Sequence, residues 1–302
     1  MNDRAGEPIP EAIPESIPKS ISGLLTEARR RLGGQPGGGP EFRLEADLLL
    51  AHVLGAGRAW LFANREHPVA ADRARAFLAL VDRRVAGEPV AYLLGQREFW
   101  SLPLEVTPDV LIPRPETELL VGTALAFIPD DAAWRVADLG TGSGAVALAI
   151  ATERSRCEVH ASESSPRALQ IAERNVAAIA PGRVSLHLGS WLEPLPGQFH
   201  VIVSNPPYVA AGDPHLAEGD CRFEPREALT PGADGMTAIR RIAEEALPRL
   251  EPGGLLAFEH GFDQGAASRA LLLDLGYVDV ATLRDLEDRE RVTRGKRLAP
   301  EH

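Results

Sequence analysis

Cysteine is scarce in this sequence, and its scarcity excludes several classes of protein. Only Cys157 and Cys221 stand among 302 residues, too few for a disulfide framework. No Cys-x-x-Cys or His-x-x-x-His spacing indicates a metal site. The composition therefore predicts a reduced, cytoplasmic protein without a resident metal ion.

Long apolar runs are also missing. No stretch approaches the roughly 18 consecutive apolar residues of a membrane span. The first 20 residues are rich in proline, carry the imperfect repeat "IPEAIPESIPKS", and lack the apolar core of a secretory signal. We expect a disordered tail over 1–19 and no contact with a membrane.

Positive charge is in deficit, since the formal net charge is −11. A field of that sign repels nucleic acid. Basic residues gather only at Arg29–Arg31 and in "RERVTRGKR" near the C-terminus, and we interpret both as solvated faces or strand ends. Stable binding of nucleic acid is therefore not expected.

The apolar fraction of 44% is enough for sizeable cores, and the length predicts about two domains. Residues 20–94 have a helical pattern, clearest where Ile21, Leu24, Leu25, Ala28 and Leu32 recur near a 3.6-residue period. Ser20 or Ser22 suits the N-cap of that first helix. We predict a small helical bundle, which holds no nucleophile constellation.

The helical residue pattern ends after residue 94. Residues 95–115 alternate apolar side chains, contain several prolines, and have few helix formers. We interpret them as a short hairpin and a linker between two domains.

Residues 116–302 alternate between strand and helix patterns. Strands spaced by single helices predict a mostly parallel, doubly wound sheet. The last two strand patterns, 277–285 and 291–298, are joined by a few residues only, so they must pair antiparallel.

Ligands of such sheets bind at the carboxyl ends of the strands, and three stretches fall there. Asp138–Gly144, "DLGTGSG", is a glycine turn leading into a helix, where backbone approaches a ligand closely. Glu163 ends the next strand, where a ribose diol is commonly bound. The third stretch, "SNPPYV" at 204–209, is a stiff extended stub after the fourth strand.

Each stretch also has a structural interpretation. A glycine turn alone is weak evidence, Glu163 can be a surface residue that caps a helix, and "SNPPYV" can be a strand-to-loop corner. Their meeting on one sheet edge favours the binding interpretation, because three independent corners of that kind seldom coincide.

Together these features resemble class I S-adenosylmethionine-dependent methyltransferases, in the branch that methylates planar nitrogens. The segments "GQREFWSLPLEVTPDVLIPRPETE", "DLGTGSGAVALA", "SNPPYV", "RFEPREAL" and "RDLEDRERVTRGK" narrow it to the PrmC/HemK family, over roughly residues 20–298. These are protein-(glutamine-N5) methyltransferases of class-1 peptide chain release factors. The resemblance implies an α/β fold with a seven-stranded doubly wound sheet, a terminal antiparallel hairpin and a small N-terminal helical bundle.

The resemblance also implies the reaction. A methyl group passes from S-adenosylmethionine, leaving S-adenosylhomocysteine, to the side-chain amide nitrogen of the glutamine in a Gly-Gly-Gln motif, which modulates translation termination. The implied catalytic residues are Asn205, Pro206, Pro207 and Tyr208. Asn205 and the Pro206 carbonyl accept the two amide hydrogens, Tyr208 packs on the flat amide, and Pro207 stiffens the corner.

The cofactor site follows from the same resemblance. Its methionine part is implied to lie along the glycine turn, its ribose on Glu163, and its adenine beside Trp191. The implied cofactor-binding residues are Asp138, Gly140, Thr141, Gly142, Ser143, Gly144, Glu163, Trp191 and Asn205.

Two positions depart from the family pattern: Glu163 stands where Asp is common, and Ser190 where Asp is frequent. Glu does the same work one methylene longer, whereas Ser190 leaves the adenine amino contact of the family unassigned in this sequence. For Arg114 and Glu116 we keep two interpretations, a role at the active-site mouth or a structural salt bridge. Glu259 and His260 are interpreted as structural.

The expected partner is a class-1 release factor, gripped by the bundle at 20–94 and methylated by the domain at 116–302 of a monomer. The chain's own Gly33-Gly34-Gln35 is interpreted as a coincidence rather than a self-methylation site. The main alternative is a DNA or RNA adenine-N6 methyltransferase, which the acidic charge and the lack of a basic recognition domain oppose. A binding module without turnover is the third possibility, opposed by the intact Asn205, Tyr208 and glycine turn.

Overall fold

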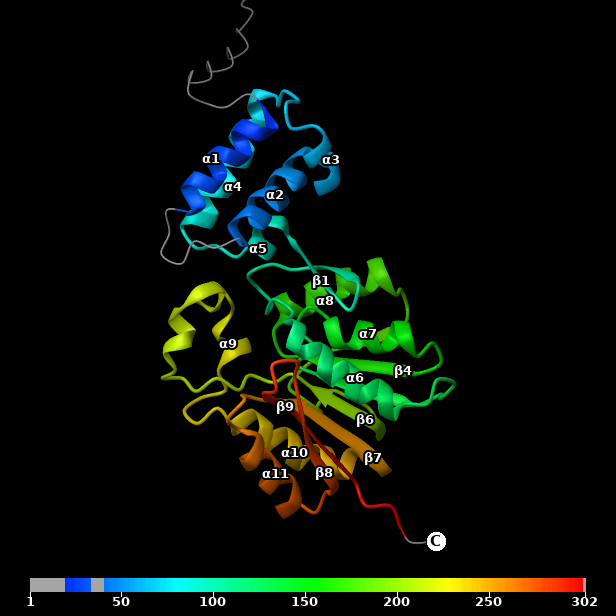
Figure 1. Cartoon of the computed structure of the whole chain (residues 1–302). Coiled ribbons are helices and arrows are strands. Elements are labelled where there is room, and N and C mark those ends of the chain that lie inside the picture. The colour runs from blue at the N-terminus through cyan, green and yellow to red at the C-terminus, as the bar shows by residue number, and fades with distance from the viewer. Residues whose placement is uncertain (1–19, 34–40, 301–302) are drawn as a thin grey trace, which may run out of the picture. The chain divides into compact units, whose positions relative to one another are not determined.

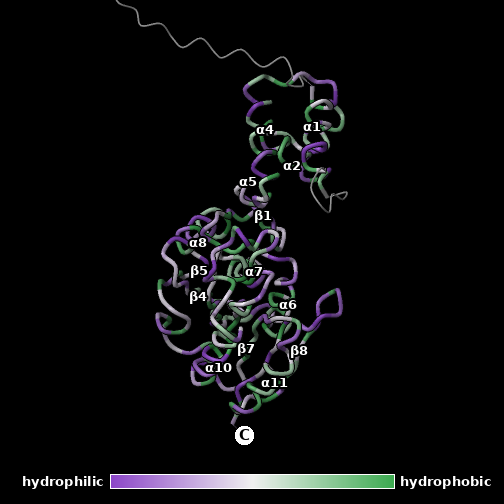
Figure 2. Tube along the Cα trace, turned by 90° about the vertical axis from the view of Figure 1, so that its left-hand side faces the viewer, coloured by the Kyte–Doolittle hydropathy of each residue, from purple (hydrophilic) through white to green (hydrophobic). Residues whose placement is uncertain are grey.

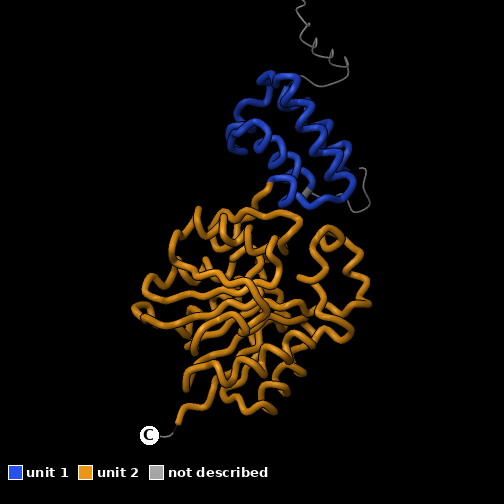
Figure 3. The backbone as a smooth tube through the Cα atoms, turned by 180° about the vertical axis from the view of Figure 1, so that it is seen from behind, with its two compact units in different colours: residues 1–94 blue, residues 95–302 orange. Residues whose placement is uncertain are grey.

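The computed structural model describes residues 20–33 and 41–300. The predicted tail at 1–19 and the Gly34-Gln35 pair lie outside the described residues. The chain divides into two compact units, Met1–Leu94 and Gly95–His302 (Figure 3). No helix within the described ranges is long and apolar enough to cross a membrane.

The N-terminal unit is helical. It comprises α1 Ile21–Gly33, α2 Glu41–Leu54, α3 Arg58–Ala63, α4 Ala71–Val85 and α5 Val90–Leu94. Helices α1, α2 and α4 pack against one another, and colour changes along them in Figure 2 mark their mixed hydropathy. The five apolar residues predicted to face the core of α1 are all buried. Ser20 caps that helix, accepting the Gly23 N–H at 3.2 Å. Short helices α3 and α5 were not predicted.

The C-terminal unit is built on the predicted seven-stranded sheet. Its strands are β3 Arg135–Leu139, β4 Glu158–Glu163, β5 Val184–Leu188, β6 Phe199–Ser204, β7 Leu250–Glu259, β8 Val278–Arg284 and β9 Glu290–Lys296. Their order is β5-β4-β3-β6-β7-β9-β8. The first five are parallel to one another, whereas β9 runs antiparallel to both β7 and β8, so the terminal hairpin is confirmed.

Helices cover both faces of this sheet (Figure 1). They are α6 Glu118–Phe127, α7 Ala145–Glu153, α8 Pro166–Ile179, α10 Thr237–Arg249 and α11 Gly265–Asp274. Successive strand residues point to opposite faces, so Val136 packs with α6 and α7 while Ala137 packs with α10. The sheet is therefore buried on both sides, as its near-continuous apolar strands require.

A hairpin of β1 Gln96–Phe99 and β2 Leu102–Glu105 forms within the segment 95–115, where a hairpin was predicted. Phe99 and Leu104 are buried in the core of the C-terminal unit, so the hairpin belongs to that unit. The 3₁₀ turn η1, Pro115–Thr117, follows it and leads into α6.

A long connection between β6 and α10 carries only short helical pieces. These are η2 Pro214–Ala217, η3 Gly219–Arg222 and α9 Arg226–Leu229. Regular structure was not predicted for this stretch, because pieces of four residues leave no periodic signal.

Candidate active site

The register of the sheet brings the three predicted stretches together. Leu139, the last residue of β3, lies opposite Ser162 of β4 and Ser204 of β6. Gly140 and Asn205, which follow β3 and β6, and Glu163, the last residue of β4, therefore lie at one edge of the sheet. This is the carboxyl edge, where ligands of doubly wound sheets bind.

The glycine turn after β3 has a backbone that few other residues adopt. Gly140, Gly142 and Gly144 have φ values of 69°, 56° and 85°, in the left-handed region. A Cβ at Gly142 would meet no atom within 4 Å, so the turn leaves open space on that side. Gly144 is the N-cap of α7, and the turn therefore ends at a helix N-terminus.

Glu163 ties the end of β4 to this turn. Its Oε2 accepts the Gly142 N–H at 2.9 Å, and its Oε1 accepts the Ser165 N–H at 2.9 Å. The side chain is buried. Its Oε1 also accepts from Ser164 Oγ at 3.4 Å, whereas Oε2 keeps a second lone pair. The carboxylate is thus held rigidly and can still accept hydroxyl donors from a ligand.

Asp138 is a buried carboxyl beneath the turn, with 1% of its surface exposed. Its Oδ2 accepts hydrogen bonds from Thr141 Oγ1 at 2.6 Å and from the Ala147 N–H at 3.1 Å. Burial raises the pKa of Asp138 to about 6; the charge of Glu163 adds to the rise, and the two hydrogen bonds oppose it. Because an anion here is costly, the site favours a cationic neighbour.

Replacing Asp138 with asparagine is expected to remove part of the pH dependence of the free energy of unfolding, because an amide does not titrate. Asp138 keeps its proton up to pH about 6 when folded but loses it near pH 4 when unfolded, so wild-type stability falls as pH rises across that window. Asparagine can keep both hydrogen bonds through Oδ1. Between pH 4 and pH 7, urea unfolding should show the free energy of unfolding of the variant rising by about 2 kcal/mol relative to that of the wild type. The same difference between the two proteins at both pH values would contradict this.

The stub after β6 presents two free acceptors. Asn205 Nδ2 donates to Thr117 Oγ1 at 3.1 Å, which directs its Oδ1 away from that hydroxyl. Neither Asn205 Oδ1 nor the Pro206 carbonyl oxygen accepts a hydrogen bond from any residue that the structure describes. Pro206 is buried and Pro207 half-buried, so the corner is stiff as well as anchored.

Tyr208 is held by hydrogen bonds at its side-chain hydroxyl and at its backbone carbonyl oxygen. Its hydroxyl donates to Glu259 Oε1 at 3.0 Å, and its carbonyl oxygen accepts from Gln264 Nε2 at 3.0 Å. Burial and the nearby Glu259 carboxyl raise the pKa of Tyr208 well above its usual range. The phenol therefore keeps its hydrogen at neutral pH and fixes the direction of the stub.

A pocket opens in front of these residues. Of the predicted residues it is lined by Asp138, Gly140, Thr141, Gly142, Ser143, Glu163, Trp191, Asn205 and Pro207. Gly144, Pro206 and Tyr208 are not among its lining residues within the described part of the chain. Trp191 packs against the turn, since a Cβ at Gly140 would lie 3.2 Å from its ring. No three or more His, Cys, Asp or Glu side chains in the described ranges are arranged to hold a metal ion.

Sequence reasoning missed the outer walls of the pocket. They come from the loop before η1 and from the long connection after β6, through Val110, Leu111, Pro113, Pro225, Glu227 and Ala228. The motifs "IPRPETE" and "RFEPREAL" mark these segments, but nothing in either motif says that they meet.

The two walls are joined by a buried carboxylate. Glu224, whose side chain is fully buried, accepts the Ile112 N–H at 2.9 Å and pairs with Arg114 at 2.5 Å. Burial raises the pKa of Glu224, and the Arg114 charge and the Ile112 N–H oppose the rise. Of the two interpretations of Arg114, the structure shows the salt bridge.

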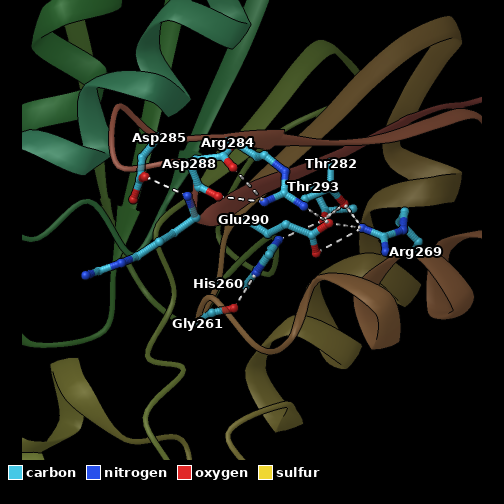
Figure 4. Close-up of polar contacts among 10 residues, drawn as sticks. His260, Gly261, Arg269, Thr282, Arg284, Asp285, Asp288, Glu290 and Thr293 are labelled. Atoms are coloured by element: carbon cyan, nitrogen blue, oxygen red, sulfur yellow. Dashed lines mark hydrogen bonds and ion pairs between the residues drawn. The ribbon is translucent and has the colours of Figure 1, made fainter.

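His260 has a structural environment, seen in Figure 4. Its Nδ1 contacts the Gly261 carbonyl at 2.8 Å and its Nε2 contacts Thr293 Oγ1 at 2.8 Å. Thr293 Oγ1 lies 2.8 Å from Thr282 Oγ1, which accepts from Arg269. Burial lowers the pKa of His260, so a neutral ring ties β7 to the terminal hairpin.

Comparisons with known proteins show the family and the fold of this chain. Family models match at two places: the PrmC N-terminal domain over residues 23–95 and the methyltransferase small domain over residues 116–219. Among solved structures, a methyltransferase of Pyrococcus furiosus matches with a TM-score of 0.50 and 20% identity, over 72% of this chain and 97% of that one. The Thermus thermophilus 16S rRNA N2 G1207 methyltransferase, solved with AdoMet and guanosine, also has a TM-score of 0.50, with 19% identity over 67% of this chain and 49% of that one. These two likenesses concern the fold.

Curated relatives are much more similar in sequence. The release factor glutamine methyltransferase of Xylella fastidiosa strain Temecula1 is 52% identical, over 84% of this chain and 93% of its own length. That of Bordetella pertussis is also 52% identical, with 84% and 94% covered. That of Escherichia coli K12 is 47% identical, with 84% and 92% covered. The chain therefore belongs to the release factor glutamine methyltransferase family.

Proposed function

We propose that this release factor glutamine methyltransferase takes its methyl group from S-adenosylmethionine and transfers it to the side-chain amide nitrogen, N5, of a glutamine in a class-1 release factor. Relatives that share about half of its residues carry that activity in their names, which supports the reaction. The observation that carries the proposal is the pair of free acceptors at the stub, Asn205 Oδ1 and the Pro206 carbonyl oxygen.

The residues around the pocket fit S-adenosylmethionine. Glu163 suits the two ribose hydroxyls, the open side of Gly142 admits the methionine part, and Trp191 offers a flat apolar face to adenine. The buried Asp138 suits a cationic group. Bound there, the cofactor supplies a methyl group already activated on a positively charged sulfur.

The work left to the protein is to hold the glutamine. An amide nitrogen is a poor nucleophile, since its lone pair is delocalised into the carbonyl. Asn205 Oδ1 accepts one amide hydrogen and the Pro206 carbonyl accepts the other, which fixes the plane of the amide and selects an –NH2 group. Such orientation can supply most of the rate enhancement. No nucleophilic side chain takes part.

The N-terminal helical unit, residues 20–94, has the role of gripping the release factor in this proposal. The family model that matches it is specific to this family's N-terminal domain, which supports a dedicated recognition role. The protein then acts as a cytoplasmic monomer on a protein partner.

An intact-mass assay tests the function. Purified protein and S-adenosylmethionine are incubated with a class-1 release factor, and in parallel with a variant whose Gly-Gly-Gln glutamine is alanine. We expect a gain of one methyl group on the wild-type release factor only. A gain on both would move the target away from this glutamine. Transfer to adenine in DNA or RNA instead would support the alternative enzyme class.

A further inference from the structure

Glu259 stands out as a buried carboxyl next to the stub. It ends β7, beside β6, and only 1% of its surface is exposed. Its Oε1 accepts the Tyr208 hydroxyl, whereas its Oε2 is buried without a hydrogen-bond partner in the described ranges. Buried carboxylates are costly unless they are hydrogen-bonded, so this oxygen calls for a donor.

Thr117 carries a buried hydroxyl that is among the influences on the pKa of Glu259. The residue is 4% exposed, and its Oγ1 accepts from Asn205 Nδ2 at 3.1 Å. As a hydrogen-bond donor this hydroxyl opposes the rise that burial causes in the pKa of Glu259, although no well-aligned bond joins the two side chains. A hydroxyl hydrogen rotates freely, and a buried one needs an acceptor.

The direction of these hydrogen bonds decides which end of Asn205 faces the pocket. An ionised carboxylate only accepts, so Thr117 donates to it and must then accept from Asn205. The Asn205 amide is nearly symmetric in shape, and its orientation follows from its partners. With Nδ2 bound to Thr117, Oδ1 is the end left for a substrate.

We propose that Glu259 and Thr117 are positioning residues that set the polarity of the Asn205 side chain, so that its oxygen meets the –NH2 group of the substrate glutamine. We call the chain of contacts from Glu259 through Thr117 to Asn205 the relay; its role in catalysis rests on the proposed function. Glu259 also accepts the Tyr208 hydroxyl, so Thr117 holds one end of the Asn205–Tyr208 segment and Glu259 holds the other. With the opposite polarity, Asn205 would present hydrogens to the substrate and select its carbonyl oxygen instead.

Protonation of Glu259 should break the relay. The groups that face it are Tyr208, Thr117, Glu116 of η1 and Arg291 of β9, and among these Arg291 lowers its pKa and Glu116 raises it. Once protonated, Glu259 can donate to Thr117, whose own hydrogen then turns to Asn205. Activity should therefore fall toward acid pH in the wild type, and this acid limb should be missing when Glu259 is replaced by glutamine.

Two substitutions and a matched control test the relay. Glu259→Gln keeps the shape but allows donation to Thr117, and Thr117→Val removes the hydroxyl. Each is expected to lower kcat/KM about a hundredfold through misplacement of the acceptor, with the dissociation constant for S-adenosylmethionine within about threefold. Thr117→Ser should recover most of what Thr117→Val loses. Thr123→Val removes another buried hydroxyl of the same segment, one bound to the Leu119 carbonyl at 2.7 Å, and should leave activity unchanged.

The double variant Glu259→Gln/Thr117→Val separates a relay from two independent effects. A loss close to that of either single variant supports the relay, whereas losses that multiply overturn it. The relay is also overturned if Glu259→Gln is as active as the wild-type protein.

A readout without substrate keeps the relay distinct from the proposed function. The side-chain amide signal of Asn205 in ¹⁵N-labelled protein should lose its protection from hydrogen exchange in Thr117→Val but keep it in Thr123→Val. Equal protection in both overturns the relay, whatever the protein methylates. Absence of methyl transfer by the wild type, with the Asn205 signal behaving as expected, overturns the proposed function alone.

Discussion

Replacing Asn205 with alanine is expected to lower kcat about a thousandfold while the affinity for S-adenosylmethionine stays within about threefold of wild type. The methyl of alanine cannot accept an amide hydrogen, so the substrate glutamine is no longer held in the plane that transfer requires. Asn205 lines the pocket, but the hydrogen bond that joins the glycine turn to Glu163 does not involve it. Isothermal calorimetry and single-turnover methyl transfer measure the two quantities separately.

Ser204→Ala is the matched control for this prediction. Ser204 is the residue before Asn205, but its hydroxyl donates to the Leu139 carbonyl at 2.7 Å, between β6 and β3. Its loss should affect the stability of the sheet more than turnover. Equal loss of cofactor affinity and turnover in Asn205→Ala would reassign Asn205 to the cofactor.

The sheet and the glycine turn could be predicted because their signals are local. Apolar strands, helices of ordinary length and a glycine cluster each leave a pattern within a dozen residues. Because the strands of such a sheet run parallel, their carboxyl ends meet at one edge, which places Gly140, Glu163 and Asn205 together. What each residue binds is not a local property, so those roles remain proposals.

The outer pocket wall could not be predicted, because the contacts that form it join residues far apart in the sequence. Arg114 and Glu224 lie 110 residues apart in the chain, and no period or motif pairs them. The same holds for Thr117 with Asn205 and for Tyr208 with Glu259, which are 88 and 51 residues apart. Such pairs are specified by the packing of the whole unit, so a sequence offers the motifs but not their partners.

The Arg114–Glu224 pair should be the second site with a large effect. Arg114→Met leaves the Glu224 carboxylate buried without its cation. In comparable pairs such a change lowers the free energy of unfolding by about 3 kcal/mol. The connection that carries Pro225, Glu227 and Ala228 should then detach from the loop at Ile112. We expect affinity for S-adenosylmethionine to fall at least about tenfold, together with faster hydrogen exchange over residues 210–236.

Two measurements test whether the unpaired Glu224 carboxylate causes the impairment of Arg114→Met. They are the pH dependence of the variant and a double variant. Burial already raises the pKa of Glu224, and loss of Arg114 removes an opposing influence, so the folded variant holds its proton to higher pH. The loss of affinity for S-adenosylmethionine in Arg114→Met should be smallest at acid pH, where Glu224 is neutral, and should grow as pH rises. Arg114→Met/Glu224→Gln should recover most of the affinity at neutral pH, because no buried charge remains and the glutamine oxygen can still accept the Ile112 N–H. If the double variant is as impaired as Arg114→Met, Arg114 contacts the cofactor or the substrate directly, and the salt bridge is not what holds the wall in place.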